Sequence, residues 1–276
     1  MKNWLITGVS RGLGKALAEA ALARGDRVIG TVRSGDPGLT GSFHCLQLEM
    51  SDPAAIQNAA ARAFELAGGR LDVIVNNAGY GLLSPVEEAS DADLLRVFNV
   101  NVFGPIRLIK AVLPRLRAQR SGHIINITSI AGRAPNAGSG VYAATKAAME
   151  ALSQSLVQEV GPLGIHVTAI APGAFRTDFL SEHSIRQSRE WAQDYAGSAG
   201  KVIQALNGMN GKQIGDPVKA AQSILAIVDS SSPPLHLLLG SDALRRAREK
   251  LDSVIEEMDR YEEVARSTDF PRPTSN

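Results

Sequence analysis

The stretch NWLITGVSRGLG at residues 3–14 decides the fold. Its first five residues centre on an apolar triplet, which predicts a strand over 3–7. Apolar residues then recur at helical spacing from residue 12 to residue 24, so a helix follows the glycine-rich turn. This order is typical of a phosphate-binding turn, because a helix N-terminus offers free N–H groups and the positive end of its dipole. Glycine turns are also routine in α/β proteins, so the position of the turn between strand and helix carries the interpretation.

The same alternation continues along the chain. Further short apolar runs lie at 27–32, 43–48, 71–75, 123–128, 165–170 and 235–239, and helical patterns lie at 53–66, 91–113, 142–160, 217–228 and 243–264. The short runs are apolar almost throughout, which is typical of strands covered by helices on both faces. We therefore predict an α/β fold: one doubly wound Rossmann-type domain over residues 1–266, with a parallel sheet of about seven strands flanked by helices.

Several details follow from local signals. Asp52 is expected to cap the helix that begins at Pro53, and Pro114 is expected to end the helix 91–113. The apolar stripe of the last helix, 243–264, predicts ordinary core packing. Residues 267–276 are predicted to be a disordered tail.

Composition excludes several classes of protein. With 44% apolar and 21% charged residues, the 276-residue chain is neither disordered nor a coiled coil. The 29 basic and 28 acidic residues leave a formal charge of +1, so no nucleic-acid partner is expected. No apolar run approaches 18 residues, which predicts no membrane span, and the histidines and Cys45 show no metal-ligand spacing. The single cysteine excludes an intrachain disulfide, and we expect a cytoplasmic enzyme without a metal.

Further motifs accompany the glycine turn. Asn76-Asn77-Ala78-Gly79 follows the fourth strand, and a segment that begins with Pro172-Gly173 follows the sixth. Tyr142 and Lys146 stand four residues apart on one predicted helix, and Ser129 closes the preceding strand. With Gly-x-x-x-Gly-x-Gly at the first turn, the chain resembles the classical short-chain dehydrogenase/reductase family over residues 1 to about 240. The order of its segments, including residues 172–179 and the long C-terminal helix, is similar to that of the 17β-hydroxysteroid dehydrogenase branch of the family.

The resemblance implies a catalytic tetrad of Asn101, Ser129, Tyr142 and Lys146. Tyr142 would be the general acid/base, because reducing a carbonyl requires a proton and oxidising an alcohol releases one. A free tyrosine titrates near 10, and a neighbouring ammonium such as Lys146 is expected to lower that pKa. Ser129 would bind the substrate oxygen, and Asn101 would hold a water that relays protons. Tyr-x-x-x-Lys alone usually marks only a solvated helix face.

The second strand indicates which nicotinamide cofactor is bound. Val32 occupies the place where an NAD-binding sheet carries Asp or Glu, and Arg33 follows it directly. Arg11 lies in the glycine turn, and guanidinium groups suit a 2′-phosphate, although surface loops often carry arginines. We therefore predict NADP(H). The cofactor-binding residues that the resemblance implies are Gly8, Ser10, Arg11, Gly12, Leu13, Gly14, Arg33, Glu49, Met50, Asn77, Ala78, Gly79, Asn101, Tyr142, Lys146, Pro172, Gly173, Phe175 and Thr177.

Three of these assignments have a plain structural alternative. Glu49 stands where Asp is commoner in the family, and Asn77 with its neighbours could form only a turn. Thr177 could instead cap the helix that follows it.

An insertion near 174–210 interrupts the alternation of strands and helices. It carries many apolar residues, which predicts a lid over a hydrophobic pocket, although these residues could instead pack a dimer contact or the lid's own core. The expected function is hydride transfer between NADP(H) and a small-molecule carbonyl or secondary alcohol, with an apolar substrate. The alternatives are a non-catalytic NADP(H) sensor or scaffold on the same fold and a sugar-nucleotide epimerase of the extended type. The resemblance to the family also implies that the protein is a homodimer or homotetramer.

Overall fold

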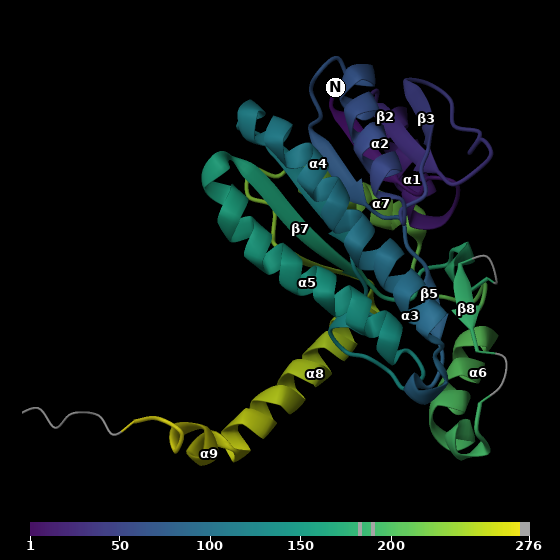
Figure 1. Ribbon diagram of the computed structural model, residues 1–276, viewed down its shortest axis with the longest axis vertical. Helices are drawn as coiled ribbons and strands as arrows, with labels where there is room; N and C mark the ends of the chain where they lie inside the picture. Colours follow the sequence, from purple (N-terminus) through teal and green to yellow (C-terminus); the bar gives the residue numbers. More distant parts are fainter. Residues whose placement is uncertain (182–183, 189–190, 271–276) are drawn as a thin grey trace, which may run out of the picture.

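A parallel sheet forms the centre of the protein (Figure 1). The computed structural model describes residues 1–181, 184–188 and 191–270. Within them the main sheet has seven strands in the order β3-β2-β1-β4-β6-β7-β9, and every pair is parallel. The strands are β1 Asn3–Thr7, β2 Arg27–Val32, β3 Phe43–Gln47, β4 Val73–Asn76, β6 Gly122–Ile127, β7 Ile165–Pro172 and β9 His236–Leu239. The predicted doubly wound sheet is confirmed.

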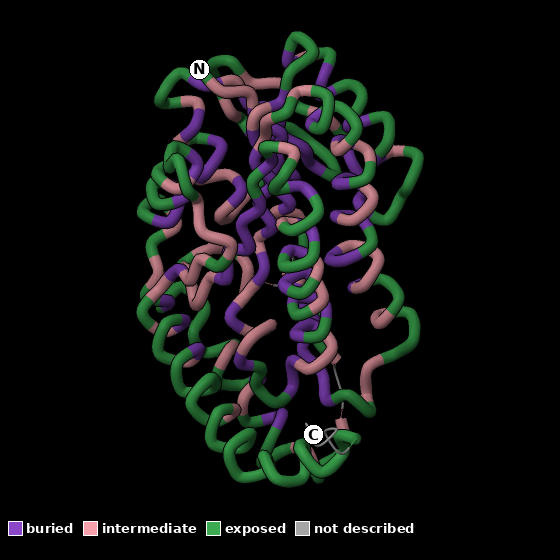
Figure 2. The backbone as a smooth tube through the Cα atoms, turned by 90° about the vertical axis from the view of Figure 1, so that its left-hand side faces the viewer, coloured by how far each residue is buried: buried purple, intermediate pink, exposed green. Residues whose placement is uncertain are grey.

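Helices cover both faces of this sheet. The helices of the fold are α1 Gly12–Ala23, α2 Pro53–Leu66, α3 Asp91–Phe98, α4 Gly104–Gln119, α5 Gly140–Val160, α6 Lys201–Gly208, α7 Pro217–Asp229, α8 Ser241–Arg260 and α9 Glu262–Arg266. Side chains of β1 alternate between two cores: Leu5 packs with α2, α4 and α5, whereas Trp4 and Ile6 pack with α1 and α7. This two-sided burial explains why the strands are apolar almost throughout, and Figure 2 shows them as the buried interior.

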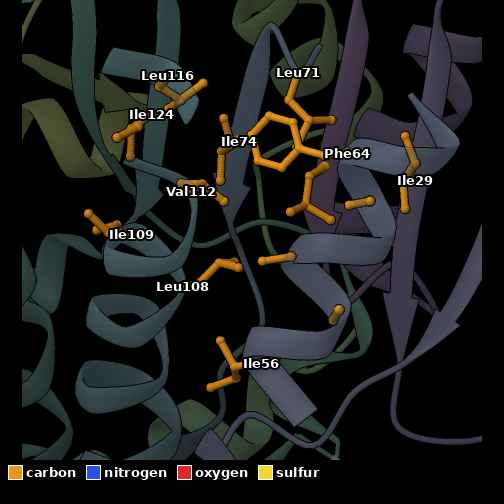
Figure 3. Close-up of a cluster of buried hydrophobic side chains, with 14 of the residues drawn as sticks. Ile29, Ile56, Phe64, Leu71, Ile74, Leu108, Ile109, Val112, Leu116 and Ile124 are labelled. Atoms are coloured by element: carbon orange, nitrogen blue, oxygen red, sulfur yellow. The ribbon is translucent and has the colours of Figure 1, made fainter. Parts of the chain in front are cut away.

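The first of these cores is built from large aliphatic side chains around one ring. Phe64 of α2 lies among residues of the central strands and of α4, including Ile74, Leu108 and Leu116, all almost completely buried (Figure 3). Burial of each such side chain stabilises the fold by roughly 1.5–3 kcal/mol.

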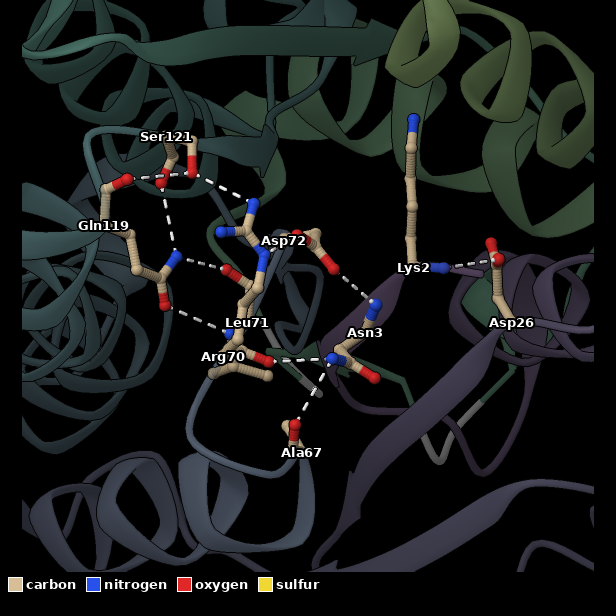
Figure 4. Close-up of polar contacts among 9 residues, drawn as sticks. All are labelled: Lys2, Asn3, Asp26, Ala67, Arg70, Leu71, Asp72, Gln119 and Ser121. Atoms are coloured by element: carbon tan, nitrogen blue, oxygen red, sulfur yellow. Dashed lines mark hydrogen bonds and ion pairs between the residues drawn. The ribbon is translucent and has the colours of Figure 1, made fainter.

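Polar contacts close the end of the sheet where the strands begin (Figure 4). The backbone N–H of Asn3 donates to Asp72 at 2.9 Å, and its side-chain amide donates to the Arg70 carbonyl at 2.9 Å. The Gln119 amide donates to the Leu71 carbonyl at 2.9 Å. These contacts fasten the loops at this end of the sheet, opposite the end where the strands finish and the glycine turn lies.

The predicted helix 91–113 has different bounds, and Pro114 does not end it. The run comprises α3, a π-helical turn at Asn99–Phe103, and α4, which continues to Gln119 with Pro114 inside it. Pro114 has no N–H to donate to the carbonyl of Lys110, four residues earlier in the helix. Both residues are exposed, so water can donate to that carbonyl instead. Val112 and Leu116 anchor the helix in the core on either side of the proline.

The run Asp91–Gln119 is long and apolar enough to cross a membrane by length and composition. Its apolar side chains have another explanation here, because Leu108, Val112 and Leu116 pack against the sheet.

The prediction that the last helix packs in the core is wrong. Only Ala243 and Ala247 of α8 are buried, and the helix leaves the body of the protein (Figure 1). The apolar stripe of α8 is exposed instead, because the helix begins within the fold and then extends beyond the edge of the core. Of the predicted disordered tail, residues 271–276 lie outside the described residues.

Candidate active site

A cavity of about 680 Å³ opens at the carboxyl ends of the central strands. The neighbours β1 and β4 mark the point where the strand order reverses, which is where doubly wound sheets bind ligands. All of the predicted cofactor-binding and catalytic residues except Asn101 line this cavity. The structure therefore brings together side chains that are spread over residues 8–177.

Hydrogen bonds join the turn after β1 to the turn after β4. The Thr7 hydroxyl accepts from the backbone N–H groups of Asn77 and Ala78, each at 3.0 Å, and donates to the Val75 carbonyl at 3.2 Å. The Asn77 amide in turn donates to the carbonyls of Thr7 and Gly8, each at 2.9 Å. Asn77 is therefore a structural clamp as well as part of the cavity wall.

The clamp explains why the turn requires glycine. A Cβ on Gly14 would lie 2.3 Å from both the Asn77 amide nitrogen and the Gly8 carbonyl oxygen. Gly8 itself has a φ of 74°, a conformation that L side chains rarely adopt. The turns after β1 and β4 therefore both lie close to the start of α1. Backbone N–H groups at the start of this helix remain available to a ligand.

Arg11 and Arg33 lie together beside this turn. With Ser10, Ser34 and Asp178 they line a second hollow of about 340 Å³ that adjoins the main cavity. Neither arginine forms a salt bridge among the described residues. The hollow thus offers two guanidinium groups and serine hydroxyls to an anion, against the single carboxylate of Asp178.

The turns after β3 and β7 also border the cavity. Met50 is buried in its wall, whereas the Glu49 carboxylate accepts from the backbone and hydroxyl of Ser51. The predicted helix cap is confirmed, since Asp52 accepts from Ala54 and Ala55 at 2.9 and 3.1 Å. Thr177 lines the cavity and also caps the short 3-10 helix at Asp178–Leu180. The alternative prediction, that Thr177 caps the following helix, is therefore correct as well.

Tyr142 and Lys146 lie on the same face of α5, and both are buried in the cavity wall. The Lys146 Nζ atom lies 5.8 Å from the centre of the Tyr142 ring and donates to the Ile127 carbonyl at 3.0 Å. Ser129 follows β6, and its hydroxyl accepts from the backbone N–H of Ala131 at 3.1 Å. The three side chains therefore meet at the cavity, as the sequence predicts.

Burial dominates the acidity of this pair. It raises the pKa of Tyr142 to about 12, while the nearby Ser129 hydroxyl acts in the opposite direction. It also lowers the pKa of Lys146 to about 8, opposed by the carboxylate of Glu150. The expected lowering of the Tyr142 pKa by Lys146 is not found: burial raises this pKa, and the group that opposes the rise is the Ser129 hydroxyl.

Asn101 is the one predicted site residue that does not line the cavity. It is 2% exposed, and its side chain exchanges hydrogen bonds with the backbone N–H and carbonyl of Tyr80 at 3.1 and 2.9 Å. It also bonds to the Thr145 hydroxyl at 3.2 Å. The π-helical turn thus directs Asn101 at the segment before β5, where it fixes the backbone next to Gly79. Its water-relay role stays a prediction.

Glu150 is a site residue that the sequence interpretation missed. It lies one helical turn beyond Lys146 and is buried. The Thr128 hydroxyl donates to its carboxylate at 2.5 Å, and Arg133 donates at 2.8 Å. Positions 142, 146 and 150 follow one another at intervals of four, so helical periodicity alone places this carboxylate on the same face.

The predicted lid forms one wall of the cavity. Its strand β8 Ile185–Gln187 pairs in parallel with β5 Gly81–Leu83, which anchors it to the body. Phe179, Leu180, Leu206 and Met209 line the cavity, whereas Ile203 of α6 is fully buried. The apolar residues therefore face the pocket and also pack against the body, where Ile203 lies next to Gly138 and Phe179 packs with Leu82 and Tyr142. Residues 182–183 and 189–190 of this segment lie outside the described residues.

Comparison with known proteins places this geometry in a family. The family model for short chain dehydrogenase matches residues 2–188. A 3-ketodihydrosphingosine reductase of Bacteroides thetaiotaomicron is 33% identical, over 86% of this chain and 87% of the relative. The crystal structure of a short-chain dehydrogenase from Streptomyces avermitilis superposes with a TM-score of 0.90 and 41% identity, covering 97% and 98% of the two chains.

A serine dehydrogenase complexed with NADP+ superposes with a TM-score of 0.73 and 27% identity, covering 86% of this chain and 93% of the neighbour. The likeness to 17β-hydroxysteroid dehydrogenases stays a prediction. The match of the family model over most of the chain, together with the structural similarity, shows that the chain belongs to the short-chain dehydrogenase/reductase family.

Proposed function

We propose that the protein is an NADP(H)-dependent oxidoreductase that interconverts an apolar ketone and the corresponding secondary alcohol. One observation carries this function: Tyr142, Lys146 and Ser129 line the same cavity as the glycine turn. A proton donor, a cation and a hydroxyl therefore stand where a dinucleotide held by the turn would reach them. Membership of an oxidoreductase family supports this reaction class.

The residues present fit NADP(H). The turn around Gly14 leaves no room for a Cβ and would receive the phosphates at the start of α1. Arg11 and Arg33 would hold the 2′-phosphate, and Val32 places no carboxylate against it. The NADP+ in the serine dehydrogenase structure supports this choice. When bound, the cofactor supplies or accepts the hydride.

The chain's own residues manage the proton. With a pKa of about 12, Tyr142 is protonated at neutral pH and can donate its proton to a carbonyl oxygen. Ser129 would hydrogen-bond the same oxygen and stabilise the charge that develops there. Lys146, with a pKa of about 8, is mostly charged at neutral pH and would stabilise the phenolate that remains. This arrangement favours carbonyl reduction at neutral pH.

The substrate side of the cavity is apolar. Phe179, Leu180, Leu206 and Met209 face it from the lid, and the Phe179 ring lies 6.0 Å from that of Tyr142. Such a wall suits a hydrocarbon next to the reacting oxygen, since apolar surface gains by leaving water. The relative named for 3-ketodihydrosphingosine supports a ketone of this type. We also propose a cytoplasmic location, because a single cysteine suits a reducing compartment.

Replacement of Tyr142 by Phe tests the function. Purified wild-type protein is expected to oxidise NADPH with long-chain aliphatic, aromatic or steroid ketones. The Tyr142→Phe variant should lose about 10²- to 10⁴-fold in kcat, the usual contribution of a general acid, while its NADPH affinity is preserved. Tyr261→Phe, at an exposed tyrosine far from the cavity, is the control. Tight NADPH binding without reduction of any carbonyl would contradict catalysis and favour a cofactor-binding sensor.

The pH profile tests the roles of Lys146 and Glu150. Because Lys146 loses its charge above a pKa of about 8, kcat/KM for reduction should fall as the pH rises through that value. Glu150 raises this pKa, so Glu150→Gln should move the decline to lower pH. The matched control is Glu159→Gln, at an exposed position on the same helix. An unmoved decline, or one displaced to higher pH in a variant that is still folded, would contradict this role.

Cofactor choice depends on Arg33. Arg33→Asp removes a guanidinium and places a carboxylate against the 2′-phosphate, so the NADPH/NADH preference in kcat/KM should fall at least tenfold, or about 1.4 kcal/mol. Arg62→Asp, on an exposed face of α2, makes the same change in charge and should leave the preference unaltered. If Arg33→Asp also leaves it unaltered, the assignment of the 2′-phosphate to this hollow is wrong.

A further inference from the structure

The α8 stripe is an exposed row of apolar side chains, and no other part of the described residues covers it. It consists of Leu244, Leu251, Ile255, Met258 and Tyr261, which are 43%, 61%, 54%, 66% and 54% exposed. Helix α8 and the short α9 project from the body, and Figure 2 shows this end of the tube as exposed. A row of exposed apolar side chains along one side of a projecting helix marks an interaction site.

Charge divides the same helix into two halves. The first half carries the cations Arg245, Arg246, Arg248 and Lys250 with the carboxylates Asp242 and Glu249. The second half carries the carboxylates Asp252, Glu256, Glu257 and Asp259 with the single cation Arg260. Arg245 pairs with Glu249 and Arg246 donates to the Ala134 carbonyl, so Arg248 and Lys250 carry the positive charge that can face a partner. These two cations and the acidic second half are complementary to a second copy of the helix that runs in the opposite direction.

Two charged residues that flank the stripe define how the two antiparallel helices would be aligned. Lys250 and Glu257 are seven residues apart, so they lie nearly in line along one edge of the stripe. In an antiparallel pair that is centred between Leu251 and Val254, Lys250 faces Glu257 of the partner subunit, and the two-fold axis forms this contact twice. A parallel pair would instead align basic half with basic half and acidic half with acidic half.

We propose that the α8 stripe is a homotypic interface on which a second copy of this chain packs its own α8 antiparallel. Apolar contact along the stripe supplies the affinity, and the contacts between Lys250 and Glu257 select direction and register. A lipid surface fits less well, because interfacial helices carry mainly Lys and Arg on their polar face whereas the projecting half of α8 is acidic. This inference does not depend on the catalytic proposal.

Charge reversal combined with mixing tests the interface. The molar mass in solution is measured by light scattering, without cofactor or substrate. Wild-type protein should contain at least two chains of 29.2 kDa. Lys250→Glu and Glu257→Lys should each halve the molar mass, because like charges then face each other at both contacts. An equimolar mixture of the two variants, and the double variant K250E/E257K, should each restore it. Glu256→Lys makes the same charge change on the opposite face and should leave the molar mass unchanged.

Several results would overturn the interface. One is a wild-type molar mass of a single chain at tens of micromolar. Another is a molar mass that neither single variant alters, which would place any assembly on a different surface. A third is failure of the mixture to reassociate although both variants keep the wild-type circular dichroism spectrum. Binding of the wild type, but not of Met258→Ser, to vesicles of phosphatidylcholine and phosphatidylglycerol would assign the stripe to a membrane instead.

Discussion

The clamp between Thr7 and Asn77 is the constraint on which the crevice depends. Two turns that are 70 residues apart in sequence share four hydrogen bonds between their side chains and backbones. This contact leaves no space for a side chain at Gly14, so the start of α1 packs directly against both turns. The surface proposed to bind the phosphates is thus shaped by backbone geometry that only glycine permits, at the point where the strand order reverses.

The same end of the sheet holds a costly pair of buried polar groups. Tyr142 and Lys146 are removed from water, which opposes the charged form of each. The Ile127 carbonyl and the Glu150 carboxylate offset the cost of burying the charged Lys146 ammonium. Thr128 and Arg133 hold that carboxylate in place. Such burial is poor for stability and useful for catalysis, because it keeps the phenol protonated for donation beside a cation that can stabilise the resulting anion. Glu150 therefore belongs to the chemistry of the site although it lies behind it.

Sequence reasoning predicts the sheet and most of its helices, and nearly all of the site residues that it predicts line the cavity. It succeeds there because burial on both faces makes the strands apolar, and because the glycine turn and the Tyr–Lys spacing are short-range patterns. It fails at Pro114, where an exposed carbonyl tolerates a proline. It also does not show the π-helical turn at Asn99–Phe103, which directs the Asn101 side chain at the backbone of Tyr80. The stripe of α8 has the periodicity of a core helix, and periodicity cannot distinguish the core of one chain from an interface between two. The pairing of β5 with β8 joins segments too short to show any pattern.

The NADPH dissociation constant of an Asn77→Ala variant tests the central claim most directly. If the clamp shapes the turn for phosphate binding, loss of the two bonds to the Thr7 and Gly8 carbonyls should weaken NADPH binding at least tenfold, about 1.4 kcal/mol, while the circular dichroism spectrum stays that of the wild type. Asn58→Ala, at an exposed position on α2, provides the matched baseline. An Asn77→Ala protein that binds NADPH as tightly as the wild type would contradict the account.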